Sequence, residues 1–473
     1  MHFSIPDTQD FVNENSGSSF TGFNIHINGT FHCCLRYKQL HSLHEQLKRS
    51  LSTLVLPTFP PKKFFPLTPS QLEERRAGLE RYIQLVGQDP VLSKSELLRT
   101  FLLNAQQESS YTESQETTLD VYLMNGFRIA VNAYTTECST KVLEKACDNI
   151  DLPREYAYYF ALFLMRKEND GSVTLTRKLM DFEAPFITQR IHHECKIVIR
   201  KNYWDPCYDL ELMRDNIALN LLFIQTLSDI DRGWILTTKE ARDQLTKLQT
   251  HGNKKEFLEI ARNLSSYGVI LFPRAIVDYP EENTQTTITI GNKELCTRMM
   301  VGKKVQEAKF KVTRMRCWRV TTIHNDISSE SMNNRHKWEL SFEYLMSKNC
   351  LKWITVASEQ AMLMSVCLQS MVDELLNQKS GADVNNMQVH RSNYTPLCYI
   401  RRDGSSGMIS DSSSSDTISS LNEIDMGSRG GSRMDASSVR RKIKEKISTT
   451  VFFRSGRESV HNEAFEGIGD DDL

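Results

Sequence analysis

Residues 23–36 read Phe-Asn-Ile-His-Ile-Asn-Gly-Thr-Phe-His-Cys-Cys-Leu-Arg, and this stretch has the pattern of a β-hairpin. Apolar and polar residues alternate on both sides of the Asn28-Gly29 pair. Asn-Gly is favoured in two-residue hairpin turns because both turn positions need a positive φ. We therefore expect two antiparallel strands near the start of the chain, with one buried face between them.

The segments after the hairpin predict two helices separated by a proline-rich loop. Leucines recur every three or four residues over positions 40–47, which is a helical spacing. The loop is Leu-Pro-Thr-Phe-Pro-Pro at positions 56–61. Thr68, followed by Pro69 and Gln71, has the pattern of a capping box with proline in the first turn, so a second helix is expected to begin there.

Three basic positions in this region are difficult to explain as ordinary surface charge. Arg36 and Tyr37 close the second strand, Lys62 follows the loop, and Arg75 lies near the apolar stripe of the second helix. A cation close to a core face needs a partner, and no acid is obviously placed for all three. A phosphorylated ring would fit, because arginine can hold phosphate with two donors and a tyrosine can face the ring.

The residues after Lys62 have two interpretations. Lys63 and the apolar residues Phe64, Phe65 and Leu67 lie next to one another. Aromatic side chains beside lysines suit insertion at an anionic membrane surface, so we expect these three apolar residues to insert. The alternative is that the two phenylalanines fill the core and the lysines are solvated.

Taken together, these positions resemble a phox-homology (PX) domain over residues 1–108. The shared pattern is Arg36-Tyr37, Pro57-x-x-Pro60-x-Lys62 and Arg75-x-x-x-Leu79-x-x-Tyr82. The resemblance implies that the ligand is phosphatidylinositol 3-phosphate. It implies that Arg36 contacts the 3-phosphate and that Tyr37 stacks on the inositol ring. Lys62 would then meet the 1-phosphate and Arg75 the ring hydroxyls, with Lys38 in the same site.

The next three segments differ in their patterns. Residues 115–205 repeat the order hairpin, helix, strands, which is typical of a ubiquitin-like lobe. Residues 206–272 have a helical pattern, and residues 273–378 are mainly strands that end in one long helix. This order resembles a FERM domain with ubiquitin-like, helical and PTB/PH-like lobes. A PX domain followed by FERM-like lobes is the arrangement of one subgroup of the sorting nexins, so the expected fold class is multidomain α+β.

The PTB/PH-like lobe has an apolar strip that its core does not obviously need. From Trp338 the strand alternates until Leu345, which is apolar on the polar face, and Val372 and Leu376 stand beside the stripe of the closing helix. A strip between a strand edge and a helix is where an extended peptide can add as another strand. The alternative is that Leu345 only marks the end of the strand and that Trp318 belongs to the core.

The sorting nexin resemblance implies that Trp318, Leu345, Val372 and Leu376 line a cargo-binding groove. The cargo would be Asn-Pro-x-Tyr or Asn-x-x-Tyr motifs in cytoplasmic tails of transmembrane receptors. Integrin β chains, relatives of the LDL receptor, P-selectin and the amyloid precursor protein are the receptors that the resemblance suggests.

Residues 379–473 are expected to form a disordered tail with a partner motif at its end. Serine, glycine and charged residues dominate this segment, so it cannot bury enough apolar surface to offset its ordering entropy. Its end resembles the C-terminus with which this subgroup docks the Retriever recycling complex; those residues are Ile468, Gly469, Asp470, Asp471, Asp472 and Leu473. Asn462 and Phe465 have the form of the proposed cargo. We hypothesise that they fold back into the chain's own groove until cargo or Retriever displaces them.

The composition argues against several other classes of protein. There are 58 basic and 59 acidic residues in 473, a net charge of -1, so no whole-molecule field would attract nucleic acid. The 11 cysteines and the His192–Cys195 run lack metal-ligand spacing, so reduced thiols and no metal or cofactor are expected. No secretory signal or bilayer-length apolar segment is seen, so a cytoplasmic protein on the cytosolic face of early or recycling endosomes is expected.

These patterns predict a monomeric, non-enzymatic endosomal adaptor that returns receptors to the cell surface and away from lysosomes. A lipid-modifying enzyme would need a phosphate-binding loop or a catalytic motif, and neither is found in the sequence. The remaining alternative is a FERM-type linker or scaffold between membrane and cytoskeleton. A basic actin-binding tail would favour that alternative, whereas this tail ends in acidic residues.

Overall fold

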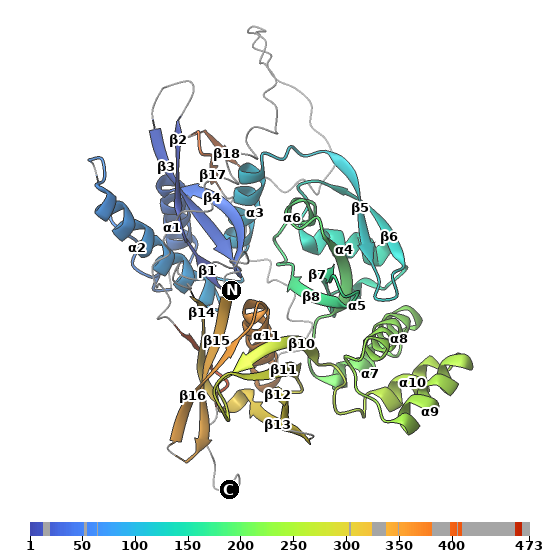
Figure 1. Ribbon diagram of the computed structural model, residues 1–473. Coiled ribbons are helices and arrows are strands. Elements are labelled where there is room, and N and C mark those ends of the chain that lie inside the picture. The colour runs from blue at the N-terminus through green and yellow to red at the C-terminus, as the bar shows by residue number, and fades with distance from the viewer. Residues whose placement is uncertain are drawn as a thin grey trace.

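The computed structural model describes residues 1–12, 19–51, 54–63, 65–301, 304–323, 337–348, 350–380, 398–403, 405–408 and 459–465. An N-terminal module is followed along the chain by three lobes (Figure 1). The N-terminal module, in blue, lies above the strands of the third lobe and beside the first lobe. The helical second lobe, in green, lies at the opposite end of the molecule from the N-terminal module.

The N-terminal module combines a four-stranded antiparallel sheet with three helices. Its elements are β1 (Phe3–Ser4), β2 (Thr8–Val12), β3 (Ser19–Ile27), β4 (Thr30–Arg36), α1 (Tyr37–Ser50), α2 (Pro69–Gln88) and α3 (Glu96–Ser110). The predicted hairpin is confirmed, because Asn28 and Gly29 join β3 to β4 with φ values of 50° and 78°. The predicted capping box is also confirmed: the Thr68 side chain accepts from the Gln71 amide, and the Gln71 side chain accepts from the Thr68 amide.

The first lobe has a mixed five-stranded sheet in the order β6-β5-β9-β7-β8. Its elements are β5 (Glu116–Tyr122), β6 (Arg128–Tyr134), α4 (Ser139–Asp148), α5 (Arg154–Ala157), β7 (Phe160–Lys167), β8 (Val173–Lys178), α6 (Pro185–Ile191) and β9 (Cys195–Lys201). The first strand, β5, runs parallel to the last strand, β9, and the other pairs are antiparallel. This is the ubiquitin-like order that the sequence predicted.

The second lobe is helical, as predicted, and it shares a core with the first lobe. Its elements are η1 (Pro206–Tyr208), α7 (Asp209–Leu212), α8 (Asn216–Asp231), α9 (Lys239–Thr250) and α10 (Lys254–Ala261). The Asp215 side chain caps α8 by accepting from the amides of Ile217 and Ala218. Such a cap satisfies two of the amide groups that have no partner inside the helix.

The third lobe is a large antiparallel sheet closed by one long helix. Its elements are β10 (Ile270–Val277), β11 (Thr284–Gly291), β12 (Glu294–Val301), β13 (Lys304–Lys311), η2 (Val312–Arg314), β14 (Met315–Ile323), β15 (Lys337–Ser347), β16 (Cys350–Ala357) and α11 (Ala361–Lys379). The strand order is β13-β12-β11-β10-β16-β15-β14-β19, where β19 comes from the tail. The predicted apolar stripe of α11 packs in the core, since Met364, Leu368 and Met371 are at most 1% exposed.

Two short parts of the tail are ordered strands, which corrects the expectation that all of residues 379–473 are disordered. β17 (Cys398–Ile400) and β18 (Ser406–Met408) form a hairpin, and β19 (Val460–His461) pairs with β14. Figure 1 places the hairpin beside α3 and β3 of the N-terminal module. Composition failed to predict this order because both segments are stabilised by contacts with distant domains rather than by a core of their own.

The N-terminal module contacts both the first and the third lobes through hydrogen bonds. The His2 imidazole lies 2.6 Å from the Ser365 hydroxyl of α11, and the Trp318 indole donates to the same hydroxyl at 2.9 Å. Gln106 of α3 accepts from the Ala184 amide at 2.8 Å, which joins the module to the first lobe. Among the helices that the structure describes, none combines the length and apolarity needed to cross a bilayer.

Candidate lipid and peptide binding sites

The first candidate site lies in the N-terminal module where α1 and α2 face each other. The Arg75 guanidinium of α2 stands 4.4 Å from the centre of the Tyr37 ring of α1. The Tyr37 hydroxyl donates to the carbonyl of Pro60 at 2.7 Å, which ties the proline-rich loop to the ring. Burial raises the pKa of Tyr37, and the charge of Arg75 partly offsets that rise. The structure therefore brings two of the predicted residues and the predicted loop together.

Arg75 retains an unused donor in this site. Its Nη2 atom is buried and has no hydrogen-bond partner among the described residues. A buried donor of a charged group without a partner costs free energy. An incoming acceptor, such as a hydroxyl or phosphate oxygen, would satisfy that donor.

Arg36 also carries a charge that no described carboxylate balances. Its guanidinium lies 3.9 Å from the centre of the Phe20 ring, and its Nη1 donates to the carbonyl of Arg402 at 2.6 Å. Partial burial lowers the pKa of this guanidinium. Because a ring face and a carbonyl leave the positive charge in place, Arg36 remains suited to an anionic ligand.

The neighbouring Arg76 shows what a structural arginine looks like in the same helix. It is 7% exposed, and its side chain pairs with Glu73 and Glu80 and donates to the carbonyl of Ile5. Burial by itself would lower the pKa of Arg76, but its hydrogen bonds and charge contacts with the two glutamates raise it. Sequence reasoning missed this residue. The signal was present, since acids lie three residues before it and four after it.

The remaining predicted lipid-site residues lie on the surface. Lys38 and Lys62 are exposed. Phe65 is 84% exposed, whereas Leu67 is half-buried. The alternative in which Phe65 fills the core is therefore wrong. Phe64 lies outside the described residues.

The second candidate site is the edge of the third-lobe sheet at β14. There, β19 adds as an antiparallel strand, with Trp318 opposite Val460 and Cys317 opposite His461. The next residue, Asn462, is 6% exposed, and its backbone amide donates to the carbonyl of Arg316 at 3.1 Å. An eighth strand of the sheet thus comes from the tail.

Asn462 fixes the end of this added strand with its side chain. Its Nδ2 donates to the carbonyls of Val312 and Met315 at 2.8 and 2.7 Å, and its Oδ1 accepts from the Ala464 amide at 3.0 Å. The Asn462 carbonyl accepts from the Phe465 amide at 3.1 Å, which closes a four-residue turn. The predicted pair Asn462 and Phe465 therefore begins and ends one turn on the third lobe.

The four side chains predicted to line an exposed groove are mostly buried. Trp318 is 0% exposed and Val372 is 1% exposed, so both are core residues in this structure. Leu345 is 8% exposed, and the register of β15 with β16 becomes irregular directly after it. This agrees with the alternative that Leu345 lies near the end of its strand. Leu376 is half-buried. The expectation of an exposed apolar strip is corrected, because Val460 and Ala464 of the tail pack in the same cluster as Trp318, Val372 and Leu376.

The predicted partner motif at residues 468–473 lies outside the described residues. Within the described part of the chain, no cluster of three or more His, Cys, Asp or Glu side chains could hold a metal ion. The His192–Cys195 run instead places the ring of His192 4.0 Å from the Glu194 carboxylate.

Four family models match the chain, one after another. They are the PX domain over residues 23–105, the sorting nexin 17/27/31 F1 lobe of the FERM domain over 117–204, the sorting nexin 17/31 F2 lobe over 205–265, and the sorting nexin 17 FERM C-terminal domain over 268–376. A PX domain followed by three FERM lobes defines a sorting nexin of the PX–FERM class. Such modules bind phosphoinositides and peptides, and none of the four models describes a catalytic domain.

Similar proteins narrow this class to one family. Sorting nexin-17 of Danio rerio is 43% identical over 489 residues, and sorting nexin-17 of Homo sapiens is 43% identical over 481, each match covering 100% of both chains. Sorting nexin-31 of Homo sapiens is 33% identical over 394 residues, which is 82% of this chain and 89% of that protein. The chain belongs to the sorting nexin-17 family, and it is an adaptor of endosomal sorting.

Two kinds of solved structure are also similar to parts of the chain. A designed CISK-PX domain is 33% identical, covering 21% of this chain and 97% of its own, with a TM-score of 0.19. A MyTH4-FERM domain of Dictyostelium discoideum myosin VII is 11% identical, covering 71% of this chain and 73% of its own, with a TM-score of 0.36. Both TM-scores are low, so the classification rests on the family models and on the relatives.

Proposed function

We propose that the edge of β14 binds Asn-Pro-x-Tyr and Asn-x-x-Tyr segments in the cytoplasmic tails of transmembrane receptors. The observation that carries this proposal is the strand and turn formed by residues 460–465. Strand addition uses backbone groups that any peptide supplies. Among residues 459–465 of the tail, the side chain of Asn462 donates to the carbonyls of Val312 and Met315, which supports a motif that begins with asparagine.

The receptor segment and the chain's own tail would then compete for one edge. The tail has glutamate and alanine between Asn462 and Phe465, where the cargo motif has proline and a variable residue. Proline is favoured at the second position of such a turn. A receptor segment can therefore form the same turn at a lower entropic cost than the tail does.

The test is a competition between peptides. A fluorescent Asn-Pro-x-Tyr receptor-tail peptide is titrated with the full chain, and unlabelled peptides are then added. A peptide of residues 458–466 should displace the labelled peptide, and the same peptide with Asn462→Ala should not. Failure of the unmodified peptide to compete, while the receptor peptide binds, would place the cargo site elsewhere. If the receptor peptide does not bind at all, a membrane–cytoskeleton linker is the function to pursue.

The lipid that we propose for the PX domain is phosphatidylinositol 3-phosphate. The support is the pairing of Arg75 with Tyr37, the unused Nη2 donor of Arg75, and the unbalanced charge of Arg36. Phe65, which is 84% exposed beside Lys63, would insert into the membrane.

Vesicle co-sedimentation tests the lipid assignment. The full chain should bind phosphatidylcholine vesicles that contain phosphatidylinositol 3-phosphate and should bind more weakly when phosphatidylinositol replaces it. Arg75→Gln should lower the affinity by about tenfold or more, because a charge-assisted hydrogen bond contributes roughly 1.5–3 kcal/mol. Arg154→Gln is a matched control, since Arg154 is an exposed arginine of the first lobe paired with Asp148. Equal loss in both variants would contradict a specific site.

The C-terminus completes the proposal. Residues 468–473 would bind the Retriever complex, which returns receptors from endosomes to the cell surface. The support is the resemblance of Ile468, Gly469 and the acidic end to the C-terminus of this subgroup. Deletion of residues 468–473 should abolish co-purification of Retriever and leave both vesicle binding and receptor-peptide binding unchanged.

A further inference from the structure

The tail hairpin β17–β18 docks on the PX domain between α1 and α3 (Figure 1). Tyr399 of β17 is 5% exposed, and its ring centre lies 5.5 Å from that of Phe101 in α3. Tyr399 belongs to the same buried cluster as the core of the PX domain. A segment that begins 288 residues after the end of α3 thus contributes one of the core side chains of this domain.

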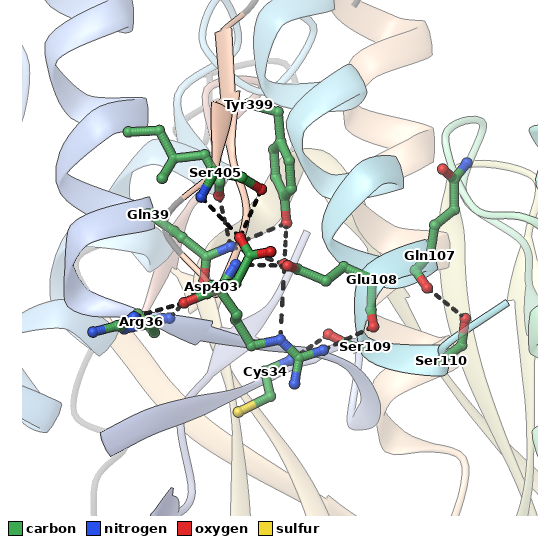
Figure 2. A network of polar contacts seen from close by, with 12 residues as sticks. Cys34, Arg36, Gln39, Gln107, Glu108, Ser109, Ser110, Tyr399, Asp403 and Ser405 are labelled. Atoms are coloured by element: carbon green, nitrogen blue, oxygen red, sulfur yellow. Dashed lines mark hydrogen bonds and ion pairs between the residues drawn. The ribbon is translucent and has the colours of Figure 1, made fainter. Parts of the chain in front are cut away.

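Glu108 of α3 is the centre of the polar contacts that hold the hairpin, as Figure 2 shows. One carboxylate oxygen accepts from the Tyr399 hydroxyl at 2.9 Å, and the other accepts from the Arg402 backbone amide at 2.6 Å. The Arg402 side chain also donates to the Glu108 carbonyl at 2.8 Å. Arg402 is 8% exposed, and rings of Phe11 and Tyr111 lie within 5.5 Å of its guanidinium. These contacts fix both the tyrosine and the arginine of the hairpin.

Two glutamines of α1, Gln39 near its start and Gln46 in its second half, connect the hairpin to that helix. Gln46 exchanges two hydrogen bonds of 2.9 Å with the backbone of Cys398. Gln39, which is 1% exposed, donates to the carbonyl of Ile400 at 2.9 Å and accepts from the Arg36 amide at 2.9 Å. The hairpin is therefore linked through Gln39 to the backbone amide of Arg36, the arginine proposed to bind the lipid.

The hairpin also holds the Arg36 side chain itself. The Arg402 carbonyl accepts from Nη1 of Arg36 at 2.6 Å, while the Phe20 ring lies 3.9 Å from the guanidinium. A ring face restricts the plane of the guanidinium, and a hydrogen bond to one nitrogen restricts rotation within that plane. Only one of its five N–H donors is used by the carbonyl.

We infer that the hairpin of residues 398–408 is a positioning part of the phosphoinositide site, completed in cis from the tail. It orients the Arg36 guanidinium before the lipid binds, so less of the binding free energy is lost in ordering that side chain. Tyr399 and Arg402 are positioning residues that act through Arg36. This inference rests on the proposed binding of phosphatidylinositol 3-phosphate.

The charges of the hairpin indicate that it orients Arg36 for the lipid headgroup rather than occupying the place of the headgroup. A segment that imitated the phosphate would bring an acid to Arg36, but the hairpin brings a neutral carbonyl. Asp403, the one acid among residues 398–408, accepts from the amide and the hydroxyl of Ser405 within its own turn. Glu108 is fully engaged by the hairpin and Gln39. The positive charge of Arg36 consequently remains available to the headgroup.

The experiment is a double-mutant cycle in the full chain, with vesicles containing phosphatidylinositol 3-phosphate. Tyr399→Ala should weaken vesicle binding about tenfold, the effect of one charge-assisted hydrogen bond, while Tyr399→Phe, which keeps the ring, should weaken it less. In an Arg36→Ala background, Tyr399→Ala should have no further effect, because the hairpin acts through that arginine. Tyr134→Ala in the first lobe is the matched control. Phosphatidylserine vesicles report non-specific binding, which should not change.

The possible outcomes separate this inference from the proposal it rests on. Unchanged or tighter binding by Tyr399→Ala, with normal binding by the parent chain, overturns the inference only. Equal losses from Tyr399→Ala in both backgrounds also overturn it, because the role would then be structural stability. No headgroup-dependent binding by the parent chain overturns both the inference and the proposed lipid site.

Discussion

The two ordered segments of the tail dock on different domains by different chemistry. The strand β19 pairs with β14 through backbone groups, and Asn462 supplies the side-chain hydrogen bonds to the third lobe. The hairpin β17–β18 docks on the PX domain mainly through Tyr399 and Arg402, which both donate hydrogen bonds to Glu108.

This difference indicates which segment can be replaced by a partner. Backbone groups are the same in every peptide, so under the proposed function another extended segment with an asparagine at the same place could replace the tail strand. The contacts of the hairpin need a tyrosine and an arginine at one spacing, and they bury both side chains. We therefore expect the strand to exchange with receptor tails and the hairpin to stay on the PX domain.

The largest effect is expected from Trp318→Ala, which should perturb the docking of the strand β19 and leave the docking of the hairpin intact. Trp318→Ala removes a fully buried side chain beneath the strand edge, and such truncations cost about 3–5 kcal/mol. Hydrogen exchange should show loss of protection in the third lobe and in residues 460–465, with protection of residues 398–400 retained. Trp353→Ala, at a tryptophan that is 37% exposed, is the control. Equal loss of protection in the hairpin would mean that the two segments are not independent.

The next effect should release the strand alone. Asn462→Ala removes the two side-chain hydrogen bonds to the carbonyls of Val312 and Met315, and at about 1 kcal/mol for each bond this costs about 2 kcal/mol. The apparent affinity of the full chain for a fluorescent Asn-Pro-x-Tyr peptide should rise by up to about 30-fold, since the tail no longer competes. Phe465→Ala should give a smaller rise because Phe465 is only half-buried. Glu463→Ala, at an exposed position, is the control, and unchanged affinity in Asn462→Ala would contradict self-competition.

Acid should weaken the PX domain before it weakens the strand. His32 is 5% exposed in β4, and burial lowers its pKa to about 4, below the ordinary value of 6.5. The unfolded chain takes up a proton below pH 6.5 and the folded chain does not, so stability falls as the pH drops from 6.5 toward 4. The loss is about 2 kcal/mol at pH 5.

Denaturant unfolding followed from pH 7 to pH 5 measures this loss. His32→Phe should remove the part that this imidazole contributes and leave the part from His2, whose pKa burial lowers to about 3. His251→Phe, at an exposed histidine of the second lobe, should leave the whole loss in place. An identical pH dependence in the parent chain and in His32→Phe would assign the acid sensitivity to other groups.

The smallest effect should strengthen the strand. Glu463 is exposed, it occupies the second position of the turn between Asn462 and Phe465, and no described backbone hydrogen bond uses its amide. Proline at this position restricts the unbound tail and contributes about 0.4–1 kcal/mol. Glu463→Pro should therefore lower the apparent affinity for the receptor peptide by about two- to fivefold. A higher affinity of Glu463→Pro for the receptor peptide would mean that the tail does not form this turn when it competes with the peptide.

Adjacent arginines show how far the sequence could predict the lipid site. The sequence singled out Arg75 and Tyr37 by their spacing around a proline-rich loop, and the structure brings both side chains and that loop together. It did not identify Arg76 as the clamped neighbour, although Glu73 and Glu80 stand at helical spacing from it. Helical spacing shows which partners are within reach, but burial decides which arginine uses them.

The predictions for the third lobe had mixed outcomes. Alternation placed Trp338 through Tyr344 correctly on a strand, and the asparagine-to-phenylalanine spacing identified the segment that forms the turn. Trp318 and Val372, which were expected to line an exposed groove, are buried here in one cluster with Val460 and Ala464 of the tail. Alternation distinguishes the two faces of a strand, but it does not show which face a distant segment of the chain covers.

The sequence by itself determined the order of the modules, the capped helices and the hairpin turns. These features depend on residue types within a few positions of one another, where periodicity and turn chemistry act. Only the tertiary structure decided that the tail folds onto both the PX domain and the third lobe. The hydrogen bond from Arg36 to Arg402 joins residues 366 positions apart. No local pattern can encode such a contact, because its free energy depends on surfaces that exist only after both domains have folded.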